Sequence, residues 1–222
     1  AGAERTIPAA AAYGMDFMSY AEMLVTAGKP SEHLKVAFVE QCVDSYRGSI
    51  GRWAIENGKH GGPDFSFSRM SWIKPNFLWM MYRCGWGTKD DQQVVLGLRI
   101  RRAFFDSLLR VAVASSFGAS GYATDGEWQA ALRGSTVRLQ WDPDHDPSGR
   151  PVERRAIQLG LRGSALAELA GAGLVEVIDM SPLVAIQREH VQAGRRELLE
   201  IPWEEVYAPP ADSARAVVAG RG

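Results

Sequence analysis

Hydrophobic and polar positions along the chain follow a helical period in some segments and a strand period in others. Apolar residues at helical spacing predict helices over residues 15–28, 101–117, 163–173 and 181–199. Apolar or alternating runs predict strands over residues 93–100, 135–141, 153–161 and 174–180. A turn-rich segment joins the second and third of these strands as a hairpin. We therefore expect α+β architecture, in a single domain with a mixed, largely antiparallel sheet and packed helices.

The ends of the later helices carry residue types that favour helix boundaries. Ser164 and Ser181 are expected to be N-caps, and Pro182 suits a first helical position. Gly171 is expected to end the helix that Ser164 begins.

Residues 31–62 fit two descriptions. A helical period that begins after Ser31 favours one helix, whereas Gly48 and Gly51 favour a strand or break near residues 42–46 that divides it. Both interpretations end the segment at glycines.

The two ends of the chain differ in composition from its middle. We expect residues 1–30 to form a helical appendage and residues 31–204 to form the single domain. Residues 205–222 are rich in Ala, Pro and Gly, so we expect a flexible tail there.

The segment 67–89 concentrates aromatic, methionine and basic side chains. Pro75 forces Lys74 toward extended geometry and suits the first position of a helix that runs to Arg83. A strand is expected before it, over residues 69–74. The helix is apolar almost all round, so we expect it to be buried.

The basic residues of this segment need their own explanation. A lysine directly before a helix N-terminus faces the positive end of the helix dipole, which is unfavourable unless an anion lies there. Arg69 is close enough to share an anion with Lys74, above a floor formed by Trp72 and Trp79 that would stack a planar ring. The alternative is that the aromatic residues are core and the cations pair with the protein's own acids.

Composition excludes several classes of protein. A net charge of -1 gives no general attraction to nucleic acid or to an anionic membrane, so anion binding requires a local cluster. The two cysteines are too few for a disulfide framework, and the chain has no long apolar span. We expect a cytoplasmic protein without membrane contact.

An acidic turn between the hairpin strands resembles a calcium loop in its spacing. The four acids that match the ligand positions are Asp142, Asp144, Asp146 and Glu153. Pro147 stands where such a loop requires glycine, and the flanks predict strands where helices are needed. We therefore expect a polar hairpin turn without a metal, and His145 at the surface.

Polar side chains interrupt the predicted hairpin strands. Residues two apart on a strand share a face, so Gln140 and Asp142 are expected on one face and Arg154 and Gln158 on another. A glutamine within an apolar strand either bonds a buried backbone group or contacts a ligand. Both interpretations stay open for Gln158.

Three sequence blocks resemble an uncharacterised family, the one catalogued as domain of unknown function 4291. The blocks are "RMSWIKPNFLWMMYRCGW", "VRLQWDP" and "RRAIQLGL". The resemblance covers roughly residues 40–180. The family usually has Ser where this chain has Cys84, which argues against a thiol mechanism, and its early tyrosine-rich block is matched at Tyr46. Membership implies no established activity.

The order of the predicted elements resembles the small NAD-cleaving ADP-ribosyltransferase fold. In that fold an Arg or His on the first strand holds the cofactor, and a Glu or Gln on a later strand directs the acceptor. Arg47 in "SYRG" and Gln158 in "AIQLGL" match these positions. The resemblance implies NAD as cofactor and a nucleic acid, a protein or a small molecule as acceptor.

We therefore expect an enzyme that binds a phosphate-bearing nucleotide and transfers the ADP-ribosyl group of NAD. Gln158 and Tyr46 are expected at the catalytic site. The residues expected to bind the cofactor are Arg47, Arg69, Trp72, Lys74, Tyr82 and Arg83. The alternative is a non-catalytic module whose Trp and Arg residues bind nucleic acid or a partner protein.

Overall fold

The computed structural model describes residues 41–204 without interruption, together with residues 13, 15–19, 22, 207 and 209–213. For residues 41–46 and Arg154 the description covers the backbone.

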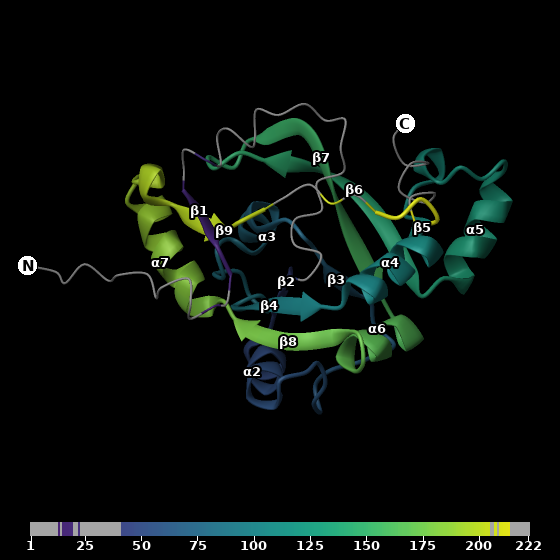
Figure 1. The fold of residues 1–222 in the computed structure, drawn as a ribbon, viewed down its shortest axis with the longest axis horizontal. Coiled ribbons are helices and arrows are strands. Elements are labelled where there is room, and N and C mark those ends of the chain that lie inside the picture. Colours follow the sequence, from purple (N-terminus) through teal and green to yellow (C-terminus); the bar gives the residue numbers. More distant parts are fainter. Residues whose placement is uncertain are drawn as a thin grey trace, which may run out of the picture.

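Three small sheets organise the described residues (Figure 1). The first has the order β2-β4-β8, with β2 Gln41–Tyr46, β4 Val94–Ile100 and β8 Leu174–Asp179. The second has the order β3-β7-β6-β5, with β3 Ser71–Ile73, β7 Pro151–Leu161, β6 Val137–His145 and β5 Val113–Ala114. The third pairs β1 Phe17–Ser19 with β9 Glu200–Pro202. All pairs are antiparallel except β5 with β6, so the predicted α+β class is confirmed.

Helices surround these sheets. They are α2 Gly48–Asn57, α3 Phe77–Cys84, α4 Arg102–Val111, α5 Asp125–Gly134, α6 Gly163–Ala170 and α7 Ser181–Gln192, with short 3-10 turns at Phe117–Ala119 and Arg196–Leu198. In Figure 1, α5 lies beside β5 at one end of the molecule, and α7 lies with β1 and β9 at the other. The long β6–β7 hairpin runs between these ends.

The central strand β4 connects two hydrophobic clusters. Leu96 and Leu98 pack into a cluster with α4, α6, β6 and β7, whereas Val95 packs into a second cluster with α3, α7 and β9. A strand buried on both faces needs apolar side chains at successive positions. This explains why the predicted strand reads as a continuous apolar run.

Helix α3 is buried, as its sequence predicts, but it begins later than predicted. Phe77 and Met81 are almost fully inaccessible, and both belong to the second cluster. Asn76 is the N-cap and accepts a hydrogen bond from Trp79 N at 2.8 Å. Pro75 therefore lies outside the helix, and the prediction that it occupies the first helical position is wrong. The side chain of an N-cap Asn accepts a hydrogen bond from a backbone N–H of the first helical turn, and a proline side chain has no acceptor for that N–H.

Several other predicted helix boundaries are also wrong. Phe17–Ser19 form a strand, since pairing with β9 overrides their helical spacing, and residues 20, 21 and 23–28 of that predicted helix lie outside the described residues. Residues 41–46 form a strand, so the divided description of this region is correct. Helix α4 ends at Val111 because the next residues pair with β6.

The serine caps are wrong as well. Ser164 lies inside α6, whose N-cap is Arg162, and Ser181 lies inside α7, whose N-cap is Met180. Ser181 N instead donates to Asp179 Oδ1 at 2.9 Å. Helix α7 stops at Gln192, well short of the predicted end.

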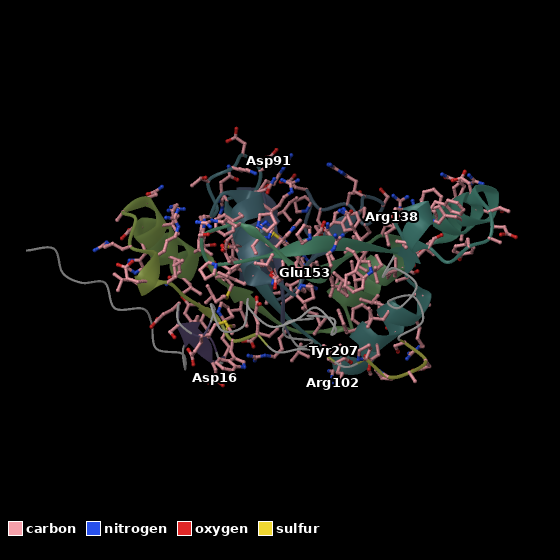
Figure 2. All side chains as sticks on the ribbon, turned by 90° about the horizontal axis from the view of Figure 1, so that it is seen from above. Asp16, Asp91, Arg102, Arg138, Glu153 and Tyr207 are labelled. Carbon is pink, nitrogen blue, oxygen red and sulfur yellow. The ribbon has the colours of Figure 1, made fainter. Side chains whose placement is uncertain are left out.

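Described residues beyond 204 contact α4. The Tyr207 hydroxyl donates to Asp106, and the Arg102 guanidinium lies 5.3 Å from the centre of the Tyr207 ring. Figure 2 shows Arg102 and Tyr207 together at one edge of the molecule. This part of the predicted tail therefore contributes to the packing of α4.

Membrane insertion by a helix finds no support in the described part of the chain. None of the helices there combines the length and the apolar character that a membrane span requires.

Candidate functional site

The register of the β6–β7 hairpin gathers polar side chains on one face of its sheet. Gln140 lies opposite Gln158, and Asp142 lies opposite Ala156. Residues directly opposite on paired strands share a face, so these side chains lie together. The prediction that Gln140 and Gln158 occupy different faces is therefore wrong. The intervening Leu139 and Ile157 point to the other face, into the first hydrophobic cluster.

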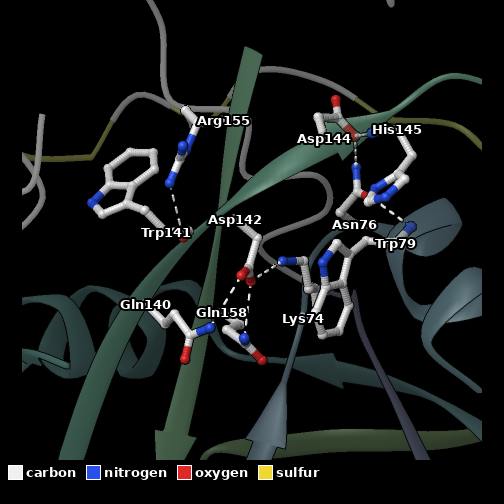
Figure 3. Close-up of polar contacts among 10 residues, drawn as sticks. All are labelled: Lys74, Asn76, Trp79, Gln140, Trp141, Asp142, Asp144, His145, Arg155 and Gln158. Carbon is white, nitrogen blue, oxygen red and sulfur yellow. Dashed lines mark hydrogen bonds and ion pairs between the residues drawn. The ribbon is translucent and has the colours of Figure 1, made fainter. Parts of the chain in front are cut away.

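Asp142 is the centre of this polar group (Figure 3). Its Oδ2 accepts hydrogen bonds from Lys74 Nζ at 2.7 Å and from Gln158 Nε2 at 2.9 Å. Its Oδ1 accepts from Gln140 Nε2 at 3.1 Å. Three donors, from β6, β7 and the end of β3, thus hold one carboxylate. We call these four residues the Asp142 cluster: Lys74, Gln140, Asp142 and Gln158. A carboxylate with this many donors is fixed in orientation.

Lys74 lies beneath the carboxylate. Its side chain has no exposed surface, whereas 12% of the Asp142 side chain is exposed. The Lys74 ammonium also lies 3.8 Å from the centre of the Trp79 ring, within the range of a cation–π contact. Asp142 therefore faces outward from the cluster, and Lys74 supports it from within.

Burial changes the acidity of Lys74. Desolvation is the largest effect and lowers its pKa to about 8, although the negative charges of Asp142 and Asp144 act in the opposite direction. A low-dielectric environment disfavours the charged ammonium, and the nearby carboxylates offset only part of that cost.

The N-terminus of α3 holds a second buried group of acids. Glu204 Oε1 accepts from Phe77 N at 2.8 Å, and Glu204 Oε2 accepts from Asn76 Nδ2 at 3.3 Å. Asp144 Oδ1 also accepts from Asn76 Nδ2, at 2.7 Å. The anion that sequence reasoning expects at this helix end is thus the protein's own Glu204, placed where the helix dipole favours it.

The tip of the hairpin lies against α3. Tyr82 stacks on His145, with ring centres 6.0 Å apart, and its hydroxyl donates to Pro147 O at 2.7 Å. Asp146 accepts backbone N–H bonds from Ser148 and Arg150, which forms the expected polar turn. His145 is half-buried, so its predicted surface position is wrong. Burial is the largest influence on its pKa and lowers it.

The structure brings three of the predicted site residues to one sheet face. Trp72 pairs with Gly160, and Lys74 follows it by two positions on the same face as Gln158. Lys74 has an internal carboxylate partner, as the alternative interpretation of its charge requires. Its predicted contact with a ligand phosphate stays a prediction.

The other predicted site residues make no contact with the Asp142 cluster among the hydrogen bonds and ion pairs of the described residues. Arg69 is exposed in the turn before β3. Arg83 is exposed in the last turn of α3, at the opposite end of that helix from Asn76. Arg47 is exposed and lies 3.3 Å from Asp91. The Tyr46 backbone pairs with Val94 at the end of β2.

Sequence reasoning missed the acids that complete the site. Asp142 was considered only as a calcium ligand and as a neighbour of Gln140, and Glu204 was not considered. Asn76 carried a usable signal, because Asn directly before an apolar run is a strong N-cap type. Glu204 gave no local signal, since its partner Asn76 is 128 residues away.

The acidic side chains do not converge as metal ligands. Within the described residues, no group of three or more His, Cys, Asp or Glu side chains could hold a metal ion. Asp142 and Asp144 have separate partners, Lys74 and Asn76, instead of a shared centre.

Comparisons with known proteins agree with the sequence blocks. The model of the family described as "Domain of unknown function (DUF4291)" matches residues 38–207, so the predicted family resemblance is confirmed. This match includes the whole Asp142 cluster. No curated protein matches the chain.

Proposed function

We propose that this chain, which belongs to the DUF4291 family, is an enzyme that binds NAD over the sheet face of β3, β7 and β6 and transfers its ADP-ribosyl group. The observation that carries the proposal is the Asp142 cluster. A carboxylate held by three donors, with 12% of its side chain exposed, lies on the same face as Trp72. NAD is the cofactor, and the acceptor is a nucleic acid, a protein or a small molecule.

The fixed carboxylate of the cluster suits this reaction. Nicotinamide leaves with the electrons of its bond to ribose C1′, and positive charge develops on the ribose. The acceptor then bonds to C1′ and releases its proton to solvent. A fixed carboxylate in a partly buried site stabilises this developing charge without reorganising. Asp142 is such a group, and Gln158 beside it is placed to orient the acceptor.

Four other predicted site residues stay part of this proposal: Tyr46, Arg69, Trp72 and Lys74. Trp72 stacks a ring of the cofactor, and the exposed Arg69 lies just before it in sequence. Lys74 acts through Asp142, because its buried ammonium fixes the carboxylate. Tyr46, at the end of β2, and the cytoplasmic location predicted for the protein stay part of the proposal.

The test is incubation of the full chain with NAD, with nicotinamide release measured by chromatography and label transfer measured by mass spectrometry. The expected result is nicotinamide release that falls about 100-fold in Gln158→Met, because the donor that helps to hold the Asp142 carboxylate toward the developing charge is lost. Glu153→Gln is the matched control. It removes a charge from an exposed position of the same strand β7 and should leave turnover unchanged.

A non-catalytic module is the rival outcome. It would bind NAD or RNA without releasing nicotinamide, and the binding would be indifferent to Gln158→Met. That result would overturn the proposed reaction.

A further inference from the structure

We infer that Arg138 and Trp72, which flank Gly160, form a binding subsite for a phosphate attached to a planar ring. The inference deepens the proposed function and rests on it for the identity of the ligand as NAD. The subsite itself would take the diphosphate and the purine of a nucleotide.

The sheet register places the three residues in one row. Arg138 on β6 lies opposite Gly160 on β7, and Gly160 lies opposite Trp72 on β3. Opposite residues share a face, so Arg138 and Trp72 are on the same side of the sheet as Gln140 and Gln158, two positions further along the strands. Their backbones are about 10 Å apart, since each strand spacing is about 4.8 Å.

The Nε of the Arg138 guanidinium has no hydrogen-bond partner among the described residues. Arg138 is half-buried, and this Nε is shielded from solvent. A shielded guanidinium donor without an acceptor is costly, and a phosphate oxygen is the acceptor that its planar geometry fits best.

Gly160 has no side chain, so neighbouring side chains can lie directly over its backbone, between Arg138 and Trp72 in the row. A Cβ added there would come within 2.6 Å of Met70 Sδ and 3.0 Å of Trp72 Cη2. The Met70 thioether and the edge of the Trp72 indole therefore both lie over the glycine, in the row that contains Arg138. An aromatic ring beside a cation can stack a base while the cation holds the phosphate that the base carries.

The spacing from this row to the Asp142 cluster fits one nucleotide. Two residues along a strand span about 7 Å, so Gln158 and Gln140 begin about that far from the row. A diphosphate on Arg138 would then place the adjoining ribose over Gln158 and the outer side of Asp142. This arrangement assigns the phosphate to Arg138, because Asp142 already neutralises Lys74.

The experiment is isothermal titration of the full chain with inorganic pyrophosphate and with ADP-ribose. Arg138→Met should weaken binding of both probes at least tenfold, because both need the guanidinium. Trp72→Leu should weaken ADP-ribose at least tenfold and leave pyrophosphate unchanged, because only ADP-ribose carries a ring. Arg133→Met is the control, since this exposed arginine lies in the last turn of α5.

Three results would overturn the inference. The wild type could fail to bind either probe, Arg138→Met could bind pyrophosphate as the wild type does, or Trp72→Leu could bind ADP-ribose as the wild type does. Should Arg138→Met fail to fold, Arg138→Lys decides the question, because it keeps the charge but loses the paired donors and should still weaken pyrophosphate binding severalfold.

Failure of this inference differs from failure of the proposed function. Binding of ADP-ribose that depends on Arg138, without nicotinamide release from NAD, would contradict the reaction and leave the subsite intact. Nicotinamide release with an unchanged KM for NAD in Arg138→Met would contradict the subsite and leave the reaction intact.

Discussion

Lys74 and Arg138 are two cations on one face of the same sheet, and their surroundings differ completely. Lys74 is fully buried, with a carboxylate at 2.7 Å and an aromatic ring beneath its ammonium. Arg138 is half-buried and has no hydrogen-bond partner within the described residues. Lys74 thus has a charged partner inside the fold, whereas the Arg138 Nε has no acceptor among the described residues.

The difference teaches how to separate a structural charge from a binding charge. A buried ion pair fixes its members in place, and removal of one partner leaves the other charge uncompensated. A shielded donor without an acceptor costs the fold free energy, so its removal does not weaken the fold, and a ligand that supplies an acceptor relieves that cost. Sequence position alone favoured Lys74 as the phosphate-binding residue, because it precedes a helix. The structure places the helix-end anion on Glu204 and the carboxylate partner of Lys74 on Asp142.

The largest expected effect is on stability in Lys74→Met. This change takes from the buried Asp142 carboxylate both its cation and a hydrogen-bond donor at 2.7 Å, a donor that a neutral Lys74 amine would keep. It should cost about 3 to 5 kcal/mol at pH 7, which lowers the melting temperature by roughly 10 °C. Lys59→Met is the control at an exposed lysine and should lie within about 0.5 kcal/mol of wild type. A loss below about 1 kcal/mol in Lys74→Met would show that the pair does not support the fold.

The pH dependence of that effect sharpens the comparison. The folded pKa of Lys74 is about 8 and the unfolded value is 10.5, so the unfolded chain binds more protons between these values. The contribution of Lys74 to stability therefore rises with pH across this window, by up to about 3 kcal/mol.

Urea unfolding of wild type and Lys74→Met between pH 7 and pH 10 measures this contribution. It is the difference between the two unfolding free energies at each pH, in which the effects of the other titrating groups cancel. A difference that stays constant, or shrinks as pH rises, would contradict the lowered pKa.

A smaller effect is expected at the N-terminus of α3. Asn76→Ala removes the N-cap acceptor and the amide that donates to Asp144 and Glu204, and should cost about 2 kcal/mol. Thr124→Ala is the matched control. It removes the N-cap of the exposed helix α5, where the loss should be about 1 kcal/mol. Equal losses at the two caps would indicate that the buried acids add nothing to the Asn76 contacts.

The smallest effect is expected for Arg138→Met without ligand. The Arg138 Nε has no partner among the described residues that the change would leave uncompensated, so the unfolding free energy should not fall by more than about 0.5 kcal/mol relative to wild type. Chemical denaturation checks the value. A loss near that of Lys74→Met would show that Arg138 supports the fold.

Local patterns explain what could be predicted from the sequence. The apolar run of β4, the burial of α3 and the pairing of β6 with β7 follow from periodicity and turn chemistry, which are properties of neighbouring residues. The contact between Lys74 and Asp142 joins residues 68 apart, and no local pattern carries it. The position of Arg138 depends on the register of two strand pairs, which a sequence alone leaves open. The sequence singled out Lys74 because it precedes a helix and Gln158 because it interrupts an apolar strand, and their roles at a site stay predictions.

The most direct test of the account is a set of thermal melts of wild type, Lys74→Met and Arg138→Met, each with and without ADP-ribose. We expect Lys74→Met to melt at a much lower temperature than wild type without ligand, whereas Arg138→Met should melt near wild type but lose the rise that ADP-ribose produces. The reverse pattern, with a stable Lys74→Met that has lost the ligand-induced rise and a destabilised Arg138→Met that keeps it, would contradict the assignment of the two cations.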